Sequence, residues 1–192
     1  AVNQILSSVG QAPVTTLDLQ NPEVSIVLNT LREVNKQVQG EGWIYNTERS
    51  YELTPDSTSN EILYPSNMLQ IDTNVEAHKN KYDVVRRNGK LYDRLNHTYT
   101  FTDNIKADVV WFFDFTDVPP AIQAYITARA ARMCCVKMVG DRELQALLQE
   151  QEMMTRAAAI EYECNQGDYS MFGFSDGHNY YNSYQPFQAL MR

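Results

Sequence analysis

Glycine is scarce in this chain, which has only eight glycines among its 192 residues. The sequence contains neither a G-x-x-x-x-G-K-[ST] phosphate-binding loop nor a G-x-G-x-x-G dinucleotide-binding sequence. Its three histidines, His78, His97 and His178, form no H-x-x-x-H or H-E-x-x-H pair. Its carboxylates are scattered and form no persuasive catalytic pair. An enzyme is therefore the weaker class, and we expect no catalytic residue, no cofactor and no bound metal.

Cysteine is also sparse, and three cysteines cannot all pair within one chain. Cys134 and Cys135 are adjacent in what we expect to be a helix. This arrangement argues against a disulfide scaffold and suits assembly in a reducing cytoplasm. A zinc site built from His97 and the cysteines is sterically conceivable, but we prefer the interpretation that the helical cysteines act as small buried hydrophobic side chains.

Long apolar runs and an excess of positive charge are missing as well. No stretch approaches 18 consecutive apolar residues, so we expect no transmembrane helix and no membrane partner. Sixteen basic residues stand against 24 acidic ones, which gives a formal net charge of −8. Sequence-independent DNA binding depends on Lys and Arg that neutralise phosphates, so a free nucleic-acid binder is not expected.

Two short basic clusters are too small for a DNA-binding patch, and we expect them to pair with acidic groups within the chain or across an interface. The clusters are Arg86-Arg87 with Lys90, and Arg129 with Arg132.

The residues that are present indicate an α+β fold that begins with helices. Within residues 1–40, apolar positions recur every three or four residues, which predicts a short helix closed by Gly10 and a longer helix over 22–39. Asn21 can cap the longer helix, and Pro22 suits its first position.

Residues 41–116 change to short segments rich in Tyr, Val, Ile and Phe, separated by turn residues. Asn88-Gly89 lies between two of them and predicts a two-residue type I′ hairpin turn. We therefore expect an antiparallel β lobe. The expected strands are 43–48, 51–54, 61–64, 68–72, 82–86, 90–93, 98–101 and 107–113.

Helical periodicity returns near the C-terminal end of the chain. Asp117 can cap a helix that begins around Pro119-Pro120 and ends at Gly140, and Asp141 can cap a last helix that runs to about Asn165. Because the connection is so short, the two helices are expected to form an antiparallel hairpin. The expected buried side chains of the first helix are Ile122, Tyr125, Ile126, Arg129, Met133 and Val136, and those of the second are Leu144, Leu147, Leu148, Met154, Ile160 and Cys164.

The expected architecture is a small antiparallel helical bundle from residues 1–40 and 117–167, with the antiparallel β lobe 41–116 inserted into it. Residues 168–192 form an extended aromatic C-terminal arm with almost no charge. Such a composition suits a contact surface, because Tyr and Phe offer large contact area at small cost in side-chain entropy. The alternative is that the arm folds back on its own subunit.

Six groups of residues occur in a characteristic order over about 1–167. They are A-V-N-x-I-L at 1–6 with Gly10 and Pro13-Val14; Gly42-Trp43-x-Tyr45-Asn46; Leu53-x-Pro55; Leu91-Tyr92-Asp93; Pro119-Pro120 with Ala124-Tyr125-Ile126 and Ala130-Ala131-Arg132; and Gly140 with Glu161-Tyr162-Glu163. Together they resemble the tail tubular protein A family, the adaptor or gatekeeper proteins of short-tailed bacteriophages.

The resemblance implies a structural protein of the virion tail, assembled in the host cytoplasm. It implies a twelve-subunit ring that joins the head portal protein to the nozzle (tail tubular B-like) protein and to the tail fibre protein. The ring would continue the channel for genome ejection, and DNA would pass through it without specific binding, which suits an acidic chain. The alternatives are a generic cytoplasmic α+β protein-interaction module and, less favoured, a small hydrolase that uses scattered carboxylates.

Three surfaces are candidates for contacts with partners. Ala158 lies in a smooth alanine patch of the last helix, where a neighbouring subunit can approach closely. The outer loops 55–67 and 74–81 of the β lobe are expected to meet the nozzle or fibre proteins, because exposed loops commonly carry binding. The expected anchors of the arm are Tyr180, Tyr181, Tyr184 and Phe187.

Overall fold

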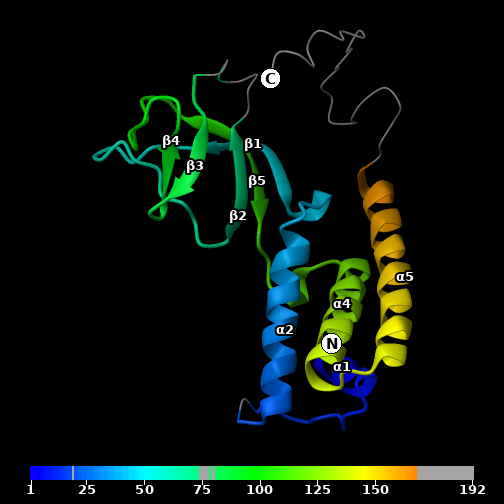
Figure 1. Cartoon of the computed structure of the whole chain (residues 1–192). Helices are drawn as coiled ribbons and strands as arrows, with labels where there is room; N and C mark the ends of the chain where they lie inside the picture. Colours follow the sequence, from blue (N-terminus) through cyan, green and yellow to red (C-terminus); the bar gives the residue numbers. More distant parts are fainter. Residues whose placement is uncertain (19, 74–77, 79–80, 168–192) are drawn as a thin grey trace.

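The structure is a computed structural model that describes residues 1–18, 20–73, 78 and 81–167. It confirms the α+β class, with a helical bundle and antiparallel β-strands (Figure 1). The helices are α1 (Val2–Ser8), α2 (Pro22–Gln39), α4 (Pro120–Met138) and α5 (Arg142–Gly167), with the short 3-10 helices η1 (Ile44–Asn46) and η2 (Phe115–Asp117). The strands are β1 (Thr47–Leu53), β2 (Met68–Thr73), β3 (Val84–Arg87), β4 (Lys90–Asp93) and β5 (Ile105–Trp111).

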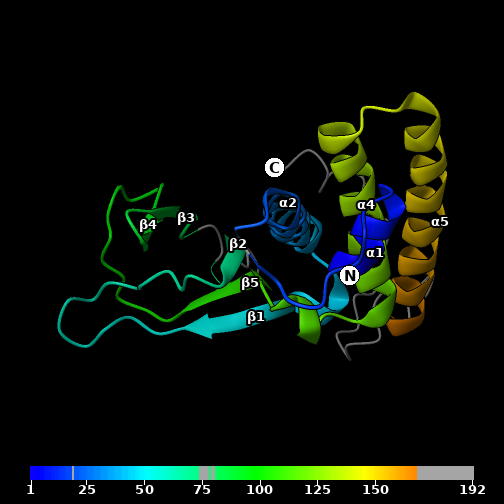
Figure 2. The ribbon, with the colours of Figure 1, turned by 90° about the horizontal axis from the view of Figure 1, so that it is seen from below.

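The helix α4 is the centre of the bundle. It packs against α1, α2 and α5, whereas α5 packs along α4 and has its other substantial contact with η1. Figures 1 and 2 both show α5 at the outer edge of the molecule, on the side opposite the β lobe. Eight residues of α4 are buried, but only Leu148 and Ala159 of α5 are. The bundle therefore has one helix surrounded by neighbours and one helix covered on a single side.

The helix α2 covers the range that the sequence predicts, 22–39. The side chain of Asn21 accepts a hydrogen bond from the backbone N–H of Glu23 at 3.0 Å, and Pro22 occupies the first turn. Its buried apolar residues are Val24, Val27, Leu31, Val34 and Val38.

The start of α4 differs from the expectation. Asp117 lies in η2 and caps nothing, since the residue before α4 is Pro119 and no side-chain cap is present. Instead, the Gln123 side chain donates to the backbone carbonyls of Phe115 and Val118 at 2.9 and 2.8 Å. Val136 is 52% exposed although the adjacent Cys134 and Cys135 are buried, so it lies on the solvent side of α4 and its assignment to the core was wrong.

The strands form a three-stranded antiparallel sheet in the order β1–β5–β2, together with the β3–β4 hairpin. The two positions of the hairpin turn, Asn88 and Gly89, have φ angles of 53° and 72°, as a type I′ turn requires. Two expected strands, 61–64 and 98–101, are wrong: they make only isolated bridges. The expected strands 43–48 and 51–54 are replaced by η1 and one continuous strand β1, whose register shifts between Glu48 and Tyr51.

The β lobe has its own buried apolar cluster, separate from that of the bundle. Its central members are Leu53, Met68, Leu91, Phe101, Ile105 and Val109. That the bundle and the lobe are separate domains stays a prediction.

Two buried amide side chains join the bundle to the lobe. The Gln39 side chain accepts from the N–H of Phe113 and donates to its carbonyl, both at 2.8 Å. The Asn46 side chain donates to the carbonyls of Gln39 and Trp111, at 2.9 and 2.8 Å, and accepts from the N–H of Trp43 at 2.8 Å. These bonds satisfy backbone groups that the helix and strand ladders leave unpaired, and they account for the tight turn of η1.

Candidate interaction surfaces

The side of α5 that faces away from α4 is exposed and carries several apolar side chains. We define the outer face of α5 by six exposed residues: Leu147, Met153, Met154, Ala157, Ala158 and Ile160. Leu147 is 65% exposed and Met154 is 63% exposed. Solvent-facing apolar side chains occur singly on most proteins, but a row of them along one helix marks a contact site.

The expected burial of α5 was therefore largely wrong. Of the six side chains assigned to its core, Leu148 is buried and Leu144 is half-buried, whereas Leu147, Met154, Ile160 and Cys164 are exposed. The physical reason is the edge position of α5: α4 covers one stripe of the helix, and η1 contacts it near its C-terminal end. Ala159 is completely buried, and its neighbour Ala158 lies on the outer face.

The inner side of α5 is tied to α4 by a network of charges. The carboxylate of Glu152 contacts the guanidinium of Arg132 and lies 4.0 Å from Nε of Arg129. Glu41 lies 3.2 Å from Arg129 and 3.8 Å from Arg156. The expected pairing of Arg129 and Arg132 with acidic groups is thus found within the chain. A shallow, open pocket beside the network is lined by Arg132, Gln149, Glu152, Met153 and Arg156.

The C-terminal end of α5 is held by one carboxyl group. Oε1 of Glu163 accepts a hydrogen bond from the backbone N–H of Ile44 at 2.7 Å, and burial raises the pKa of this carboxyl group. The neighbouring Tyr45 has a raised phenol pKa, because it is buried and because the Glu163 charge disfavours a second negative charge. This hydrogen bond is a structural contact between α5 and η1.

The β3–β4 hairpin carries arginines stacked on tyrosines. The guanidinium of Arg87 lies 4.1 Å from the ring centroid of Tyr92, which makes an edge contact with Tyr99 at 4.9 Å between centroids. The guanidinium of Arg86 lies 4.9 Å from the ring of Tyr64. Because Arg86 and Arg87 are consecutive in β3, their side chains lie on opposite faces of the hairpin, Arg86 with the buried Tyr64 and Arg87 with Tyr92 and Tyr99.

The two arginines of the β3–β4 hairpin differ from those of the bundle in their partners. In the part of the chain that the structure describes, no carboxylate forms a salt bridge with Arg86 or Arg87, although Lys90 pairs with Glu61 at 2.6 Å. Both arginines are exposed. The expected intramolecular pairing of this basic cluster is therefore found for Lys90 alone.

A family model described as tail tubular protein matches residues 1–169. The chain belongs to the tail tubular protein family. It is also 25% identical over 169 residues to "Tail tubular protein A" of Klebsiella phage KP34, a match that covers 86% of this chain and 87% of that relative. The expected resemblance is confirmed. The protein is a structural component of a phage tail and not an enzyme.

The described residues of this tail tubular protein give no metal site. They hold no group of three His, Cys, Asp or Glu side chains placed to bind an ion. Cys134 and Cys135 are buried in the bundle, where burial raises the pKa of Cys134, whereas Cys164 is exposed on α5. Among the same residues, every helix is too short or too polar to cross a membrane.

Several expected contact residues of the tail tubular protein lie outside the described residues. These are Tyr180, Tyr181, Tyr184 and Phe187 of the arm, and all of loop 74–81 except His78 and Lys81. Residues 173–177, G-F-S-D-G, fit the G-x-S-x-G pattern of hydrolases, which the sequence reasoning overlooked. That pattern signifies catalysis only on a strand-to-helix turn, and these residues also lie outside the described part of the chain.

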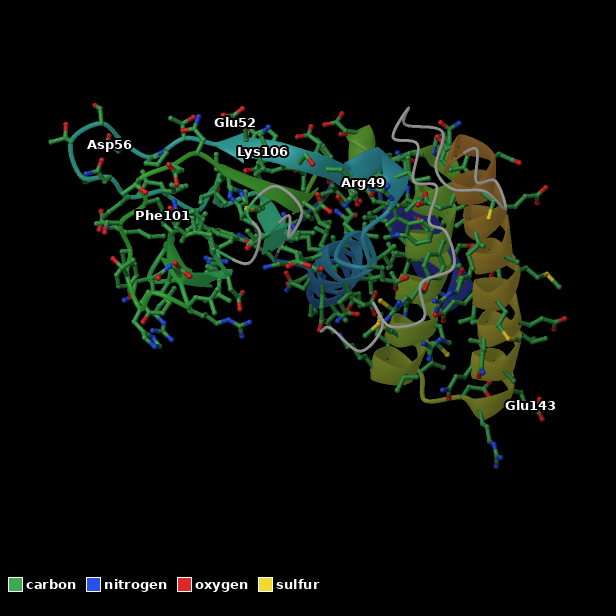
Figure 3. The ribbon with its side chains drawn as sticks, turned by 90° about the horizontal axis from the view of Figure 1, so that it is seen from above. Arg49, Glu52, Asp56, Phe101, Lys106 and Glu143 are labelled. Carbon is green, nitrogen blue, oxygen red and sulfur yellow. The ribbon has the colours of Figure 1, made fainter. Side chains whose placement is uncertain are left out.

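Loop 55–67 is described, and local hydrogen bonds order it. The Asp56 carboxylate accepts from the backbone N–H groups of Thr58 and Ser59 at 2.9 and 3.0 Å, which lowers its pKa. Figure 3 shows Asp56 at the tip of the lobe, far from Glu143 on α5. The loop thus has a defined shape at the far end of the molecule.

Proposed function

We propose that this tail tubular protein forms a twelve-subunit ring that joins the head portal to the nozzle and the tail fibres. The ring assembles in the host cytoplasm and continues the DNA channel used in genome ejection. The observation that carries the proposal is the exposed apolar outer face of α5 on one edge of the subunit. In a monomer these apolar side chains would stay exposed to water, whereas a neighbouring subunit in a ring would cover them.

The charge of the chain agrees with a channel through which DNA slides. With a formal net charge of −8 per subunit, a ring offers few cations to neutralise phosphates. DNA therefore passes without specific binding. Loop 55–67 of the lobe faces the nozzle or the fibres, and the arm adds contacts through Tyr180, Tyr181, Tyr184 and Phe187.

The proposal is tested by the mass of the assembled protein, measured alone and with the portal protein of the same phage. Native mass spectrometry and electron microscopy should give a twelve-fold ring in at least one of these samples. A protein that stays monomeric in both would contradict the proposal and favour the alternative, a generic interaction module.

Ala158→Arg tests the part played by the outer face. We expect this variant to keep the fold of the monomer, because Ala158 is exposed, and to lose twelve-fold assembly, because a long cation would stand in an apolar contact. The matched control is Ser57→Arg in the exposed loop 55–67, which should form rings as the wild type does. If Ala158→Arg forms normal rings, the outer face of α5 is not part of the contact between subunits.

A further inference from the structure

The charge network between α4 and α5 holds one cation more than it has carboxylates. Its charged side chains are those of Arg129, Arg132, Arg156, Glu41 and Glu152. Arg156 is the most exposed of them, at 53%, and its Nη2 lies 3.8 Å from the Glu41 carboxylate, which is too far for a hydrogen bond. The guanidinium of Arg156 lines the open pocket beside the network, and it is suited to one further carboxylate.

An apolar stripe of α5 leads from this pocket toward the C-terminal end of the helix. We define the stripe by Met153, Ala157, Ile160 and Cys164, whose steps of four, three and four residues place them along one side of α5. All four residues are exposed, and Met153 also lines the pocket. A segment that carries apolar side chains followed by a carboxylate would therefore fit the stripe and the pocket together.

The sequence that follows α5 has this pattern. Residues 168–192 lie outside the described residues, and only two of them, Asp168 and Asp176, are acidic. Phe172, Phe174 and Asp176 occupy every second position, so an extended segment would present two rings and one carboxylate on the same side. Aromatic rings also make favourable contacts with methionine sulfur, and a methionine lies where the stripe meets the pocket.

The length of the segment fits a return along α5. The helix ends at Gly167, and at about 1.5 Å per residue Met153 lies about 21 Å before this end along the helix axis. Nine residues lead from Gly167 to Asp176 and span at most about 30 Å, which leaves room for the turn. Asp168 follows the helix directly and cannot reach the pocket. Of the two acidic residues, Asp176 is therefore the one that the pocket can hold.

We propose that residues 168–176 fold back along α5 of their own subunit. The carboxylate of Asp176 enters the pocket and pairs with Arg156, and the rings of Phe172 and Phe174 cover the apolar stripe. The connection to α5 is only nine residues long, so this segment is present at a far higher effective concentration than the same segment of a neighbouring subunit. The contact gives the network the carboxylate that balances its charge.

The return of this segment leaves the contact of the proposed ring open. Leu147, Met154 and Ala158 lie about 100° or more around the helix axis from Met153, so a neighbouring subunit can still cover them. The expected anchors of the arm follow Asp176 in the chain and stay available to partners. Because the contact forms within one subunit, it does not require the ring.

Oxidation of two adjacent methionines measures the contact in the full chain. Met153 and Met154 are 59% and 63% exposed among the described residues, but only Met153 belongs to the stripe. Hydrogen peroxide converts exposed methionine to its sulfoxide, and because the reagent is uncharged, its rate reports access and not the local charge. Fragmentation of the peptide in a mass spectrometer distinguishes the two sites, and Met154 serves as the internal reference.

Removing either charge of the proposed pair should expose Met153. We expect Asp176→Asn to raise the oxidation rate of Met153 at least about fivefold and to leave that of Met154 unchanged. Arg156→Gln should have the same effect, because it removes the other partner. The double variant should be no faster than the single variants, since both act on one interaction.

Matched controls remove the same groups elsewhere. Asp168→Asn, and Arg142→Gln at an exposed position of α5, should leave the oxidation of Met153 as in the wild type. Phe174→Ser should raise the rate, whereas Phe187→Ser, farther along the arm, should not. A rise in the controls equal to that in the test variants would overturn the contact.

Met133, which is half-buried against the bundle core, reports whether the fold is intact. Its oxidation should keep the wild-type rate in every variant. If it rises in Arg156→Gln, the arm variants Asp176→Asn and Phe174→Ser decide the question. Wild-type oxidation of Met153 in these two variants would overturn the proposal.

Dilution distinguishes the segment of the same subunit from that of a neighbour. Protection of Met153 within one subunit should be unchanged over a roughly hundredfold dilution of the protein. Protection that disappears on dilution would assign the segment to a neighbouring subunit and overturn the return within one chain. A protein that is monomeric with and without its portal and still protects Met153 would contradict the ring and keep this contact.

Discussion

Glu152 should contribute more to holding α5 in the free subunit than any other polar side chain of that helix. Its side chain is 14% exposed and contacts Arg132, with Arg129 at 4.0 Å. Only Leu148 and Ala159 of α5 are buried, so apolar burial alone attaches this 26-residue helix weakly. The perturbation we choose is Glu152→Gln, which keeps the size of the side chain and removes its charge.

The magnitude follows from the degree of burial. An exposed ion pair contributes about 0–1 kcal/mol, whereas removing one partner of a buried pair costs about 3–5 kcal/mol. The side chains of Arg129 and Arg132 are 24% and 29% exposed, so this network lies between the two cases, and we expect a loss of about 2 kcal/mol. That is comparable to the whole contribution of burying Leu148, about 1.5–3 kcal/mol.

Hydrogen exchange of the backbone amides in the monomer measures this loss. About 2 kcal/mol corresponds to a roughly 30-fold rise in the population of opened α5, so amides in the middle of the helix should exchange about that much faster. The matched control is Glu150→Gln, two residues away, where the carboxylate is exposed and has no salt bridge among the described residues. It should leave exchange unchanged. Equal exchange in the two variants would refute the reasoning that the network anchors α5.

The elements with local signals could be predicted from the sequence. Asn21 and Pro22 mark the start of α2 because a cap and a preset φ act within one turn of the chain. Asn88-Gly89 defines the β3–β4 hairpin because both residues accept positive φ angles. In each case the physical cause lies within a few residues of the signal.

The inner face of α5 could not be predicted in the same way. Apolar residues occur on several sides of this helix, and Leu147 and Leu148 are adjacent, so periodicity alone does not decide which stripe meets α4. The structure places Leu148 and Ala159 inward and leaves Leu147 outward. The same side of α5 carries Glu152, which contacts Arg129 and Arg132 of α4, and periodicity within α5 does not show this contact between helices.

The stacked arginines of the β3–β4 hairpin were visible in the sequence only as a small basic cluster. Its distinguishing feature is that Arg86 and Arg87 stack on tyrosines instead of pairing with carboxylates. Tyr64 comes from loop 55–67, which the sequence suggested would contain a strand at 61–64. Long-range packing, and not composition, therefore separates arginines that pair with carboxylates from arginines that stack on tyrosines.

Two further predictions concern the β lobe and the end of α5. Gly89→Val should lower the free energy of unfolding by about 1–2 kcal/mol in urea titrations, because a β-branched residue is strained at the φ of 72° found there; an unchanged midpoint would contradict this. Glu163→Gln should flatten the pH dependence of stability. Because burial raises the pKa of Glu163 in the folded chain, the folded state binds the proton more tightly than the unfolded state does. The stabilisation that protonation brings is complete below the ordinary carboxyl pKa of about 4.3 and is lost as pH rises through the raised value. Gln keeps an acceptor for the N–H of Ile44 and carries no charge. Ionisation of Glu163 lowers the melting temperature of the wild type as pH rises from the ordinary carboxyl pKa through the raised one. The variant should not show this fall. The control is Glu161→Gln, whose carboxyl is exposed and should leave the profile as in the wild type. A wild-type profile in Glu163→Gln would mean that the carboxylate at the end of α5 is solvated and does not bear the cost of burial.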